Sequence, residues 1–269
     1  MGIRFFRPCT ALADVVSRIY THESGPIEPG DLRWLIVPDG EVKLIFPVRG
    51  DIRCTIGETG RLHRTSRLIF SGIRTSPGHL AFPDGVDAIG VIIRPEAAYR
   101  LVDVPHDQLT NRTLDAEDVF GAAARRWQEE LANLPTMEAR VSAIQRVLCT
   151  WLARRDRRER AFEWAVRHLA RHEGRVRIEA LARELGWSRR HLERRFRQRL
   201  GVGPKSLAGI LRFHAVYKCL RGASGSYGRL IQAHYYDQSH FLKDFRRYTG
   251  LTPRSYADEH DYGRLYIPS

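Results

Sequence analysis

The stretch from Leu181 to Leu207, LARELGWSRRHLERRFRQRLGVGPKSL, occurs a second time in the chain after a shift of 49 residues. The second copy, Leu230 to Tyr256, reads LIQAHYYDQSHFLKDFRRYTGLTPRSY. Seven of the 27 positions are identical without a gap: Leu181/Leu230, His191/His240, Phe196/Phe245, Arg197/Arg246, Gly201/Gly250, Pro204/Pro253 and Ser206/Ser255. Such a shared frame predicts two copies of one supersecondary unit. Each copy is typical of a helix, a short turn, a second helix and a Gly-x-x-Pro exit, which is a helix-turn-helix.

In the first copy, apolar residues predict a buried face on both helices. The apolar positions are Ile178, Leu181, Ala182 and Leu185 on the first helix and Leu192, Phe196 and Leu200 on the second. Between them, Gly186 suits a turn that needs a left-handed residue, and Ser188 is a natural N-cap. The outward positions of the second helix are Arg189, Arg190, Glu193, Arg194 and Arg197. Long polar side chains on a rigid helix can reach base edges in the major groove of DNA, so we predict a recognition helix.

The second copy follows the same plan. Asp237 is the predicted N-cap, and Phe241 and Phe245 are predicted to face inward. The outward residues that could contact DNA are Gln238, Ser239, His240, Lys243 and Arg246. Pro204 is well placed to open a connecting helix that runs to about Leu220. A stiff connection would let one subunit read two successive major-groove turns, which lie about 34 Å apart.

Charge is divided unevenly along the chain. Residues 1–155 hold 20 Lys and Arg against 19 Asp and Glu, whereas residues 156–269 hold 24 against 12. Nearly the whole net charge of +13 therefore lies on the part that contains the repeat. A clustered positive charge is the electrostatic signature of polyanion binding, although a solvated basic surface would look the same.

The N-terminal half has strand signals followed by helix signals. We predict strands at 34–37, 42–48, 52–56, 68–73 and 88–93, separated by turns rich in Gly, Pro and Asp. Apolar spacing then predicts two helices, Ala116–Leu134 and Met137–Arg154, which could be core or a dimer interface. The arginine-rich run 154–160 is the best linker candidate. The predicted organisation is α+β, with a β-rich domain and helix pair over residues 1–155 and an all-α domain over residues 156–269.

Other features exclude several classes of protein. No run of 18 apolar residues exists, so we expect no membrane-spanning segment, and the N-terminus has no clean apolar region of a secretory signal. The four cysteines, Cys9, Cys54, Cys149 and Cys219, lie far apart and are typical of buried or free thiols in a reducing cytoplasm. Motifs for nucleotide binding, for a serine nucleophile and for a zinc protease are missing. We therefore predict a cytoplasmic protein that is not an enzyme and needs no metal or cofactor.

The C-terminal segment, residues 161–258, resembles the DNA-binding domain of AraC/XylS-type transcription regulators. The resemblance rests on L-A-x-E-L-G-W-S-x-x-H-L-x-R-x-F (181–196), the Gly-x-x-Pro exit, and D-Q-S-H-F-x-x-D-F-R-x-x-T-G-L-T-P-x-x-Y (237–256). By position, the base-contacting places of the family fall on Arg190, Glu193 and Arg194, and on Gln238, Ser239 and Lys243, with His240 and Leu242 nearby. The resemblance also implies double-stranded DNA and RNA polymerase as partners.

One departure from the family pattern concerns the second turn. The family normally has Gly before the aromatic residue, whereas this chain reads Ala233-His234-Tyr235-Tyr236. We expect that His234 or Tyr235 takes the turn conformation, or that the turn is remodelled. The first copy is therefore the predicted primary reader, and the second copy is predicted to set the register.

The N-terminal half resembles the sensing domain of one branch of the same family. The matching text is V-P-D-G-x-V-x-L-I-F (37–46) and R-P-x-A-A-x-x-L-x-x-V-P-x-x-x-L-T-x-R (94–112). The resemblance implies a cupin-like β-barrel that binds a small effector, forms a homodimer, or does both. Candidate effector contacts are Trp34, Asp39, Phe46 and His79, each of which an ordinary core, turn or surface role would also explain.

Two alternatives remain open from the sequence. The first is a cupin-like metal-dependent enzyme that carries a basic helical appendage. The second is a DNA-binding protein whose N-terminal half only dimerises and senses nothing.

Overall fold

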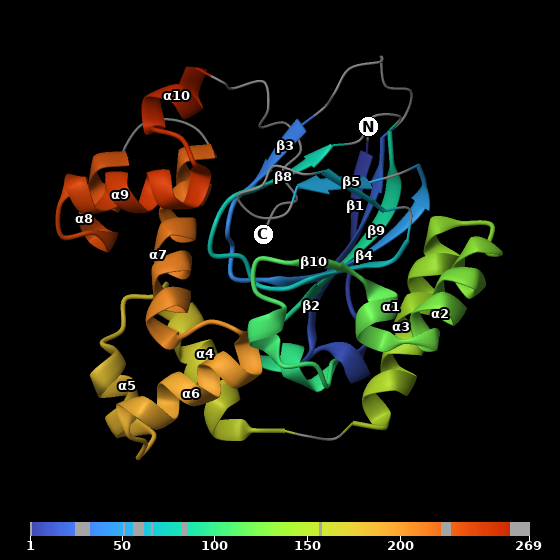
Figure 1. Cartoon of the computed structure of the whole chain (residues 1–269), viewed down its shortest axis with the longest axis horizontal. Coiled ribbons are helices and arrows are strands. Elements are labelled where there is room, and N and C mark those ends of the chain that lie inside the picture. Colours follow the sequence, from blue (N-terminus) through green and yellow to red (C-terminus); the bar gives the residue numbers. More distant parts are fainter. Residues whose placement is uncertain are drawn as a thin grey trace.

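The computed structural model describes residues 2–24, 33–50, 52–55, 62–65, 67–81, 85–155, 158–221 and 227–258. Its N-terminal part is built on β-sheets and its C-terminal part on helices alone (Figure 1). Among the described residues, none of the helices combines the length and the apolar character that crossing a membrane requires.

The described strands form two antiparallel sheets. The larger sheet has the order β1 (Gly2–Phe6), β2 (Val16–Glu23), β9 (Asp87–Ile93), β4 (Val42–Arg49), β7 (Ile69–Ser71) and β10 (Thr113–Asp115). The smaller sheet has the order β3 (Arg33–Ile36), β8 (Gly78–Ala81), β5 (Ile52–Thr55) and β6 (Leu62–Thr65). At the centre of the larger sheet, Leu44 of β4 is opposite Val91 of β9.

Alternating side chains place one core on each face of the larger sheet. On β4, Leu44 and Phe46 join the main core, whereas Ile45 packs against the second cluster. This second cluster contains Ile52 of β5 and Ile69 of β7, so the smaller sheet covers that face. Successive residues of a strand point to opposite faces, and two-sided burial explains why β4 and β9 are rich in β-branched and aliphatic residues.

The predicted strands agree with β3, β4, β5, β7 and β9, although Ile56 lies outside the described residues. Strands β1, β2, β6, β8 and β10 were not predicted. The sheet-rich N-terminal domain of the predicted fold class is thus confirmed. Among the described residues, however, the strands form two sheets rather than one closed ring, and closure into a barrel stays a prediction.

Three helices follow the sheets: α1 (Ala116–Phe120), α2 (Ala122–Ala132) and α3 (Met137–Ala153). The prediction of one continuous helix over 116–134 is wrong, because Gly121 has φ +60° and ψ −147°, a conformation that ends α1 and begins α2. The indole rings of Trp127 on α2 and Trp151 on α3 meet edge to face, with centroids 5.3 Å apart. The Trp151 indole N–H also donates to the Leu101 carbonyl at 2.8 Å, which ties α3 to the chain that leaves the sheet.

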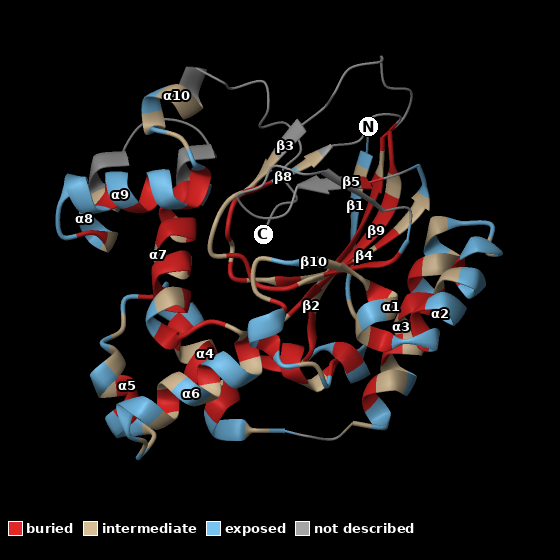
Figure 2. Cartoon of the chain, viewed as in Figure 1, coloured by how far each residue is buried: buried red, intermediate tan, exposed pale blue. Residues whose placement is uncertain are grey.

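The C-terminal part contains seven helices within the described residues. They are α4 (Arg160–Arg171), α5 (Ile178–Glu184), α6 (Arg189–Leu200), α7 (Pro204–Arg221), α8 (Tyr227–His234), α9 (Gln238–Thr249) and α10 (Pro253–Asp258). Buried residues run along α4, α6, α7 and α9 (Figure 2), and α4, α6 and α9 each pack against α7. The prediction of an all-α region with two helix-turn-helix units is confirmed by this order of elements.

The two parts share one apolar core. Two short 3-10 helices after β9, η2 (Pro95–Arg100) and η3 (His106–Gln108), pack against α4 and α6. The Tyr99 hydroxyl of η2 donates to Glu163 of α4 at 2.9 Å, and its ring meets the Phe162 ring edge to face at 5.6 Å. Gly201 at the end of α6 lies so near η3 that a Cβ atom there would be 2.2 Å from the His106 carbonyl oxygen. The N-terminal part therefore contacts the first helix-turn-helix directly.

Candidate nucleic-acid interface

The first helix-turn-helix has the local structure that its sequence predicts. Gly186 follows α5 with φ +66°, and the amide of Trp187 closes the turn by donating to the Ala182 carbonyl at 2.9 Å. A side chain at this φ would strain the backbone, which explains the glycine. The Ser188 hydroxyl then accepts from the His191 amide at 3.1 Å and caps α6. Two tight local interactions thus fix the angle between α5 and α6.

We expect Ser188→Ala to lower the free energy of unfolding by about 1 kcal/mol, because an amide in the first turn of α6 loses its acceptor. Chemical denaturation followed by circular dichroism measures this loss. Ser188→Asp keeps an acceptor at the same place and serves as the control. A loss of stability in the control equal to that of the alanine variant would contradict the capping role.

Helix α6 has one buried face and one exposed charged face. Leu192, Phe196 and Leu200 are at most 1% exposed. On the other face, Arg190, Arg194 and Arg197 are exposed, while Arg189 is exposed beside them and reaches Glu179 of α5. The predicted inward and outward positions of this helix are therefore those of the structure. Packing of the apolar face against the core fixes the position of such a helix, while the charged side chains of the other face extend into solvent.

Ion pairs distinguish the arginines of this face. Arg197 donates to Glu193 one turn earlier at 3.1 Å, and Arg189 forms an ion pair with Glu179 of α5 at 3.1 Å. Arg194 lies 3.4 Å from the ring nitrogen Nδ1 of His191 rather than against a carboxylate. Among the described residues, Arg190 has no hydrogen bond or ion pair to another side chain. Arg190 and Arg194 therefore present the least compensated positive charge on α6.

The second helix-turn-helix has a different turn. Helix α8 ends at His234, and neither His234 nor Tyr235 has a positive φ, so the turn is remodelled rather than left-handed. Tyr235 is 4% exposed and packs edge to face on Phe241, with ring centroids 5.3 Å apart. His234 reaches back to Glu173, with its Nε2 2.9 Å from the carboxylate. Packing of the buried Tyr235 ring on Phe241 therefore anchors the turn of the second unit, whereas the first unit uses the left-handed conformation of Gly186.

Helix α9 is capped as predicted, since Asp237 accepts from the His240 amide at 2.7 Å. Phe241 and Phe245 are buried. The predicted DNA contacts of this helix are all exposed: Gln238, Ser239, His240, Lys243 and Arg246. Tyr236, in the turn before the helix, is 98% exposed, and the sequence pattern predicted no role for it. Its exposure was not predictable because Tyr235, an identical residue type beside it, is buried.

Helix α7 connects the two units. Phe213 of α7 contacts the rings of Phe245 and Tyr248 of α9, at centroid distances of 5.9 Å and 5.0 Å. Arg212 of α7 donates to the Asp244 carboxylate at 3.2 Å. These contacts fix α9 on α7, and α7 in turn packs against α4 and α6. In Figure 1, α6 and α9 lie at opposite ends of α7.

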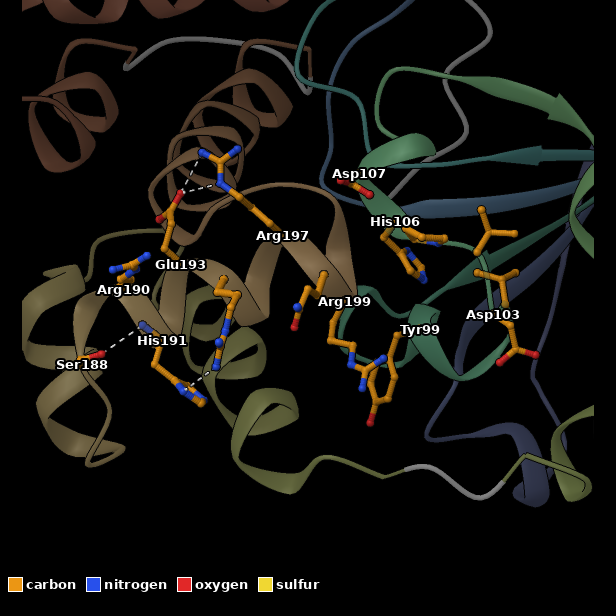
Figure 3. A pocket seen from close by; sticks show the side chains of 15 residues that line it. Tyr99, Asp103, His106, Asp107, Ser188, Arg190, His191, Glu193, Arg197 and Arg199 are labelled. Carbon is orange, nitrogen blue, oxygen red and sulfur yellow. Dashed lines mark hydrogen bonds and ion pairs between the residues drawn. The ribbon is translucent and has the colours of Figure 1, made fainter.

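A cleft of about 1010 Å3 lies between the exposed face of α6 and the chain from Tyr99 to Asp107. Figure 3 shows Arg190, Glu193 and Arg197 on one side and the residues of the N-terminal part on the other. On that second side, His106 is 4% exposed and its Nε2 has no partner among the described residues. Burial, followed by the charge of Arg199, lowers the pKa of His106 to about 4, so its ring is neutral at pH 7.

The sequence did not predict this second wall of the cleft. Tyr99 to Asp107 lies within the N-terminal text 94–112 that resembles the sensing domain, but nothing in its spacing indicates a contact with α6. Domain contacts depend on residues far apart in sequence, and local periodicity carries no information about them.

The predicted effector contacts have different surroundings. Asp39 forms an ion pair with Lys43. Phe46 is 2% exposed and lines a small pocket of about 160 Å3 beside α2, whereas His79 is exposed on β8. Trp34 lies on β3, and its side chain is outside the described part of the structure. Within the described residues, no group of three or more His, Cys, Asp or Glu side chains could hold a metal ion.

Two family models match separate parts of the chain. Residues 181–259 match a family described as a helix-turn-helix domain. Residues 4–115 match a family described as a domain of unknown function, DUF6597, and this match ends where α1 begins. No curated protein matches the chain.

Several solved structures are similar to the chain at low identity. ToxT from Vibrio cholerae is 12% identical over 95% of this chain and 98% of its own, with a TM-score of 0.49. The AraC-like transcriptional activator CuxR is 19% identical over 77% of this chain and 75% of its own, with a TM-score of 0.24. Oxalate decarboxylase from B. subtilis is 20% identical over 44% of this chain and 31% of its own, with a TM-score of 0.22.

The domain match covers both repeated units that the structure builds from α5–α6 and α8–α9. Its first residue, Leu181, is also the first residue of the repeat. The C-terminal part of this chain therefore carries a helix-turn-helix domain, in which the helix-turn-helix unit is present twice.

Proposed function

We propose that the chain is a sequence-specific DNA-binding transcription regulator. The observation that carries this proposal is the division of α6 between a core face, where Phe196 is 0% exposed, and an exposed face with Arg190 and Arg194. A guanidinium can bond O6 and N7 of guanine together, and a rigid helix makes that geometry selective. The net charge of residues 156–269, 24 basic against 12 acidic, supplies attraction to the phosphates.

The two recognition helices would read two successive turns of the major groove. The residues we assign to DNA are Arg189, Arg190, Glu193, Arg194 and Arg197 on α6, and Gln238, Ser239, His240, Lys243 and Arg246 on α9. Glu193 could accept from cytosine, and Gln238 could pair with adenine. We assign the main reading to α6 and the register to α9, because α6 carries more arginine.

The N-terminal part supplies control in this proposal. We propose that residues 1–155 bind a small effector or form a homodimer, and that the regulator acts with RNA polymerase in the cytoplasm. Direct contact of η2 and η3 with α4 and α6 supports such control, because a change in the N-terminal part alters the surroundings of the first recognition helix. A thermal-shift screen of sugars, aromatic acids, nucleotides and antibiotics on the full chain tests for an effector. A dimer that senses nothing would show no saturable shift.

The experiment that tests DNA binding uses the full chain and a random duplex library. After several rounds of selection, we expect one enriched motif that spans two major-groove turns. Its affinity should fall steeply with salt, because binding releases counterions from the phosphates. Equal binding of all duplexes at every salt concentration, or no binding at low salt, would overturn the proposal.

The alternative is a cupin-like metal-dependent enzyme with a basic helical appendage. Metal analysis of the purified chain separates the two. Stoichiometric iron or zinc together with no enriched DNA motif would favour the enzyme.

A further inference from the structure

The thiols of Cys9 and Cys149 lie in contact although they are 140 residues apart in sequence. Their sulfur atoms are 3.7 Å apart, a distance close to the sum of two sulfur radii. Both cysteines are free thiols in the structure. A disulfide bond needs a sulfur separation of about 2.05 Å, so the two atoms must approach by less than 2 Å. Rotation about the side-chain bonds of the two cysteines is the movement that would bring the sulfur atoms together.

The backbone around Cys9 is held in this position by α3 itself. The Cys9 amide donates to the side-chain oxygen of Gln145 at 2.5 Å. Gln145 and Cys149 are four residues apart and therefore lie on the same face of α3. The Cys9 carbonyl also accepts from the Leu12 amide at 2.9 Å in the short 3-10 helix η1 (Thr10–Leu12), which packs on α3. Hydrogen bonds at both the amide and the carbonyl of Cys9 therefore hold its backbone beside Cys149.

The two cysteines differ in accessibility. Cys9 is exposed, whereas Cys149 is partly buried. Burial, and then the hydrogen bond with Cys9, raises the pKa of the Cys149 thiol to about 11, which keeps it protonated at pH 7. An oxidant in solution therefore meets Cys9 first, and Cys149 is the nearest group that can react with the product.

We propose that Cys9 and Cys149 form a reversible intrachain disulfide when the protein meets a peroxide. The Cys9 thiol gives its proton to solvent and attacks one oxygen of hydrogen peroxide as thiolate; the O–O bond breaks, Cys9 becomes a sulfenic acid, and the departing hydroxide takes up a proton from solvent as the first water. The Cys149 sulfur then attacks the Cys9 sulfur, the S–O bond breaks, and the hydroxide leaves as a second water with the Cys149 proton. The two thiols lose two electrons and two protons in total, and the peroxide is reduced to two waters.

In a reducing compartment, such a bond would form only transiently, in response to an oxidant, and would not be a permanent structural crosslink. Thiols there are kept reduced, and disulfides that form are transient. The bond would join the segment after β1 to α3 and close a long loop, which restricts the unfolded chain and raises stability. It lies within the N-terminal part, so it does not depend on the DNA-binding role proposed above.

The test exposes the full chain to a small excess of hydrogen peroxide under native conditions. We expect the intact mass to fall by about 2 Da, as loss of two hydrogens requires. After tryptic digestion without reduction, the peptide of residues 5–18 should be linked to that of residues 147–154. The midpoint of thermal unfolding should rise by several degrees. Dithiothreitol should reverse all three changes.

Matched variants separate this pair from Cys54 and Cys219. Cys9→Ser and Cys149→Ser should each abolish the linked peptide and the thermal shift, while Cys54→Ser and Cys219→Ser should keep both. Gln145→Ala should slow formation of the linked peptide severalfold, because the Cys9 amide loses its anchor. A link to Cys54 or Cys219, a link between two chains, or oxidation of Cys9 to sulfinic acid without a link would overturn the proposal.

Discussion

Replacing Phe196 with alanine is expected to lower the free energy of unfolding by about 3–5 kcal/mol. Phe196 is 0% exposed on the inner face of α6, and its ring meets that of Phe162 on α4 edge to face, with centroids 5.3 Å apart. Removal of the ring leaves a cavity that the surrounding helices fill only in part, so lost transfer energy and lost contacts add. The midpoint of urea unfolding, at an unchanged slope, measures this effect.

Gln198→Ala is the matched control for this variant. Gln198 is two residues away on the exposed side of α6, so its truncation should change the free energy of unfolding by no more than about 0.5 kcal/mol. A loss below about 1 kcal/mol for Phe196→Ala would contradict the packing of α6 on α4, because a fully buried ring cannot be removed at that cost.

Truncation of Arg194 is expected to weaken binding to the selected DNA motif by about 1–3 kcal/mol and to relax the preference at one base position. Arg194 is exposed on α6, and its partner in the free protein is the ring of His191 rather than a carboxylate. Its guanidinium is therefore available to DNA without breaking an ion pair. Binding measured for the selected motif and for its single-base variants shows whether one position loses its preference.

Arg183→Ala removes the same charge from an exposed position of α5 and serves as the control. It should weaken binding to all sequences slightly and equally, as loss of general electrostatic attraction does. If Arg194→Ala instead weakens every sequence to the same extent, Arg194 contacts phosphate, and the assignment of base reading to it is wrong.

Local chemistry explains which parts of the fold the sequence predicts. Strands β4 and β9 are dense in aliphatic residues because both of their faces are buried, and that density is visible in the sequence. The turn glycine at 186 and the cap at 188 each meet a requirement of one residue and its near neighbours. Strand β2 was not predicted, because it buries Thr21 and His22 beside its apolar residues and so lacks a clear alternation.

The candidate site was also predictable only where local sequence patterns determine it. Which residues of α6 and α9 point outward follows from helical periodicity, and the structure agrees at each position. The remodelled second turn was foreseen only as one of several possibilities, because burial of Tyr235 depends on the distant Arg212 as well as on Phe241. The cleft beside α6 depends on how two domains pack, which no local pattern contains.

The apolar core that joins η2 to α4 has a thermodynamic consequence. Glu163 is 2% exposed, and its bond to Tyr99 exists only while the two parts are packed together, as does the ion pair of Arg167 with Glu96. Separation would remove the Tyr99 hydroxyl from Glu163 and the Phe162 ring from the Tyr99 ring, so opening between the parts is costly. Binding that stabilises the N-terminal sheets should therefore also stabilise the recognition helices. Binding to the recognition helices should in turn stabilise the N-terminal sheets.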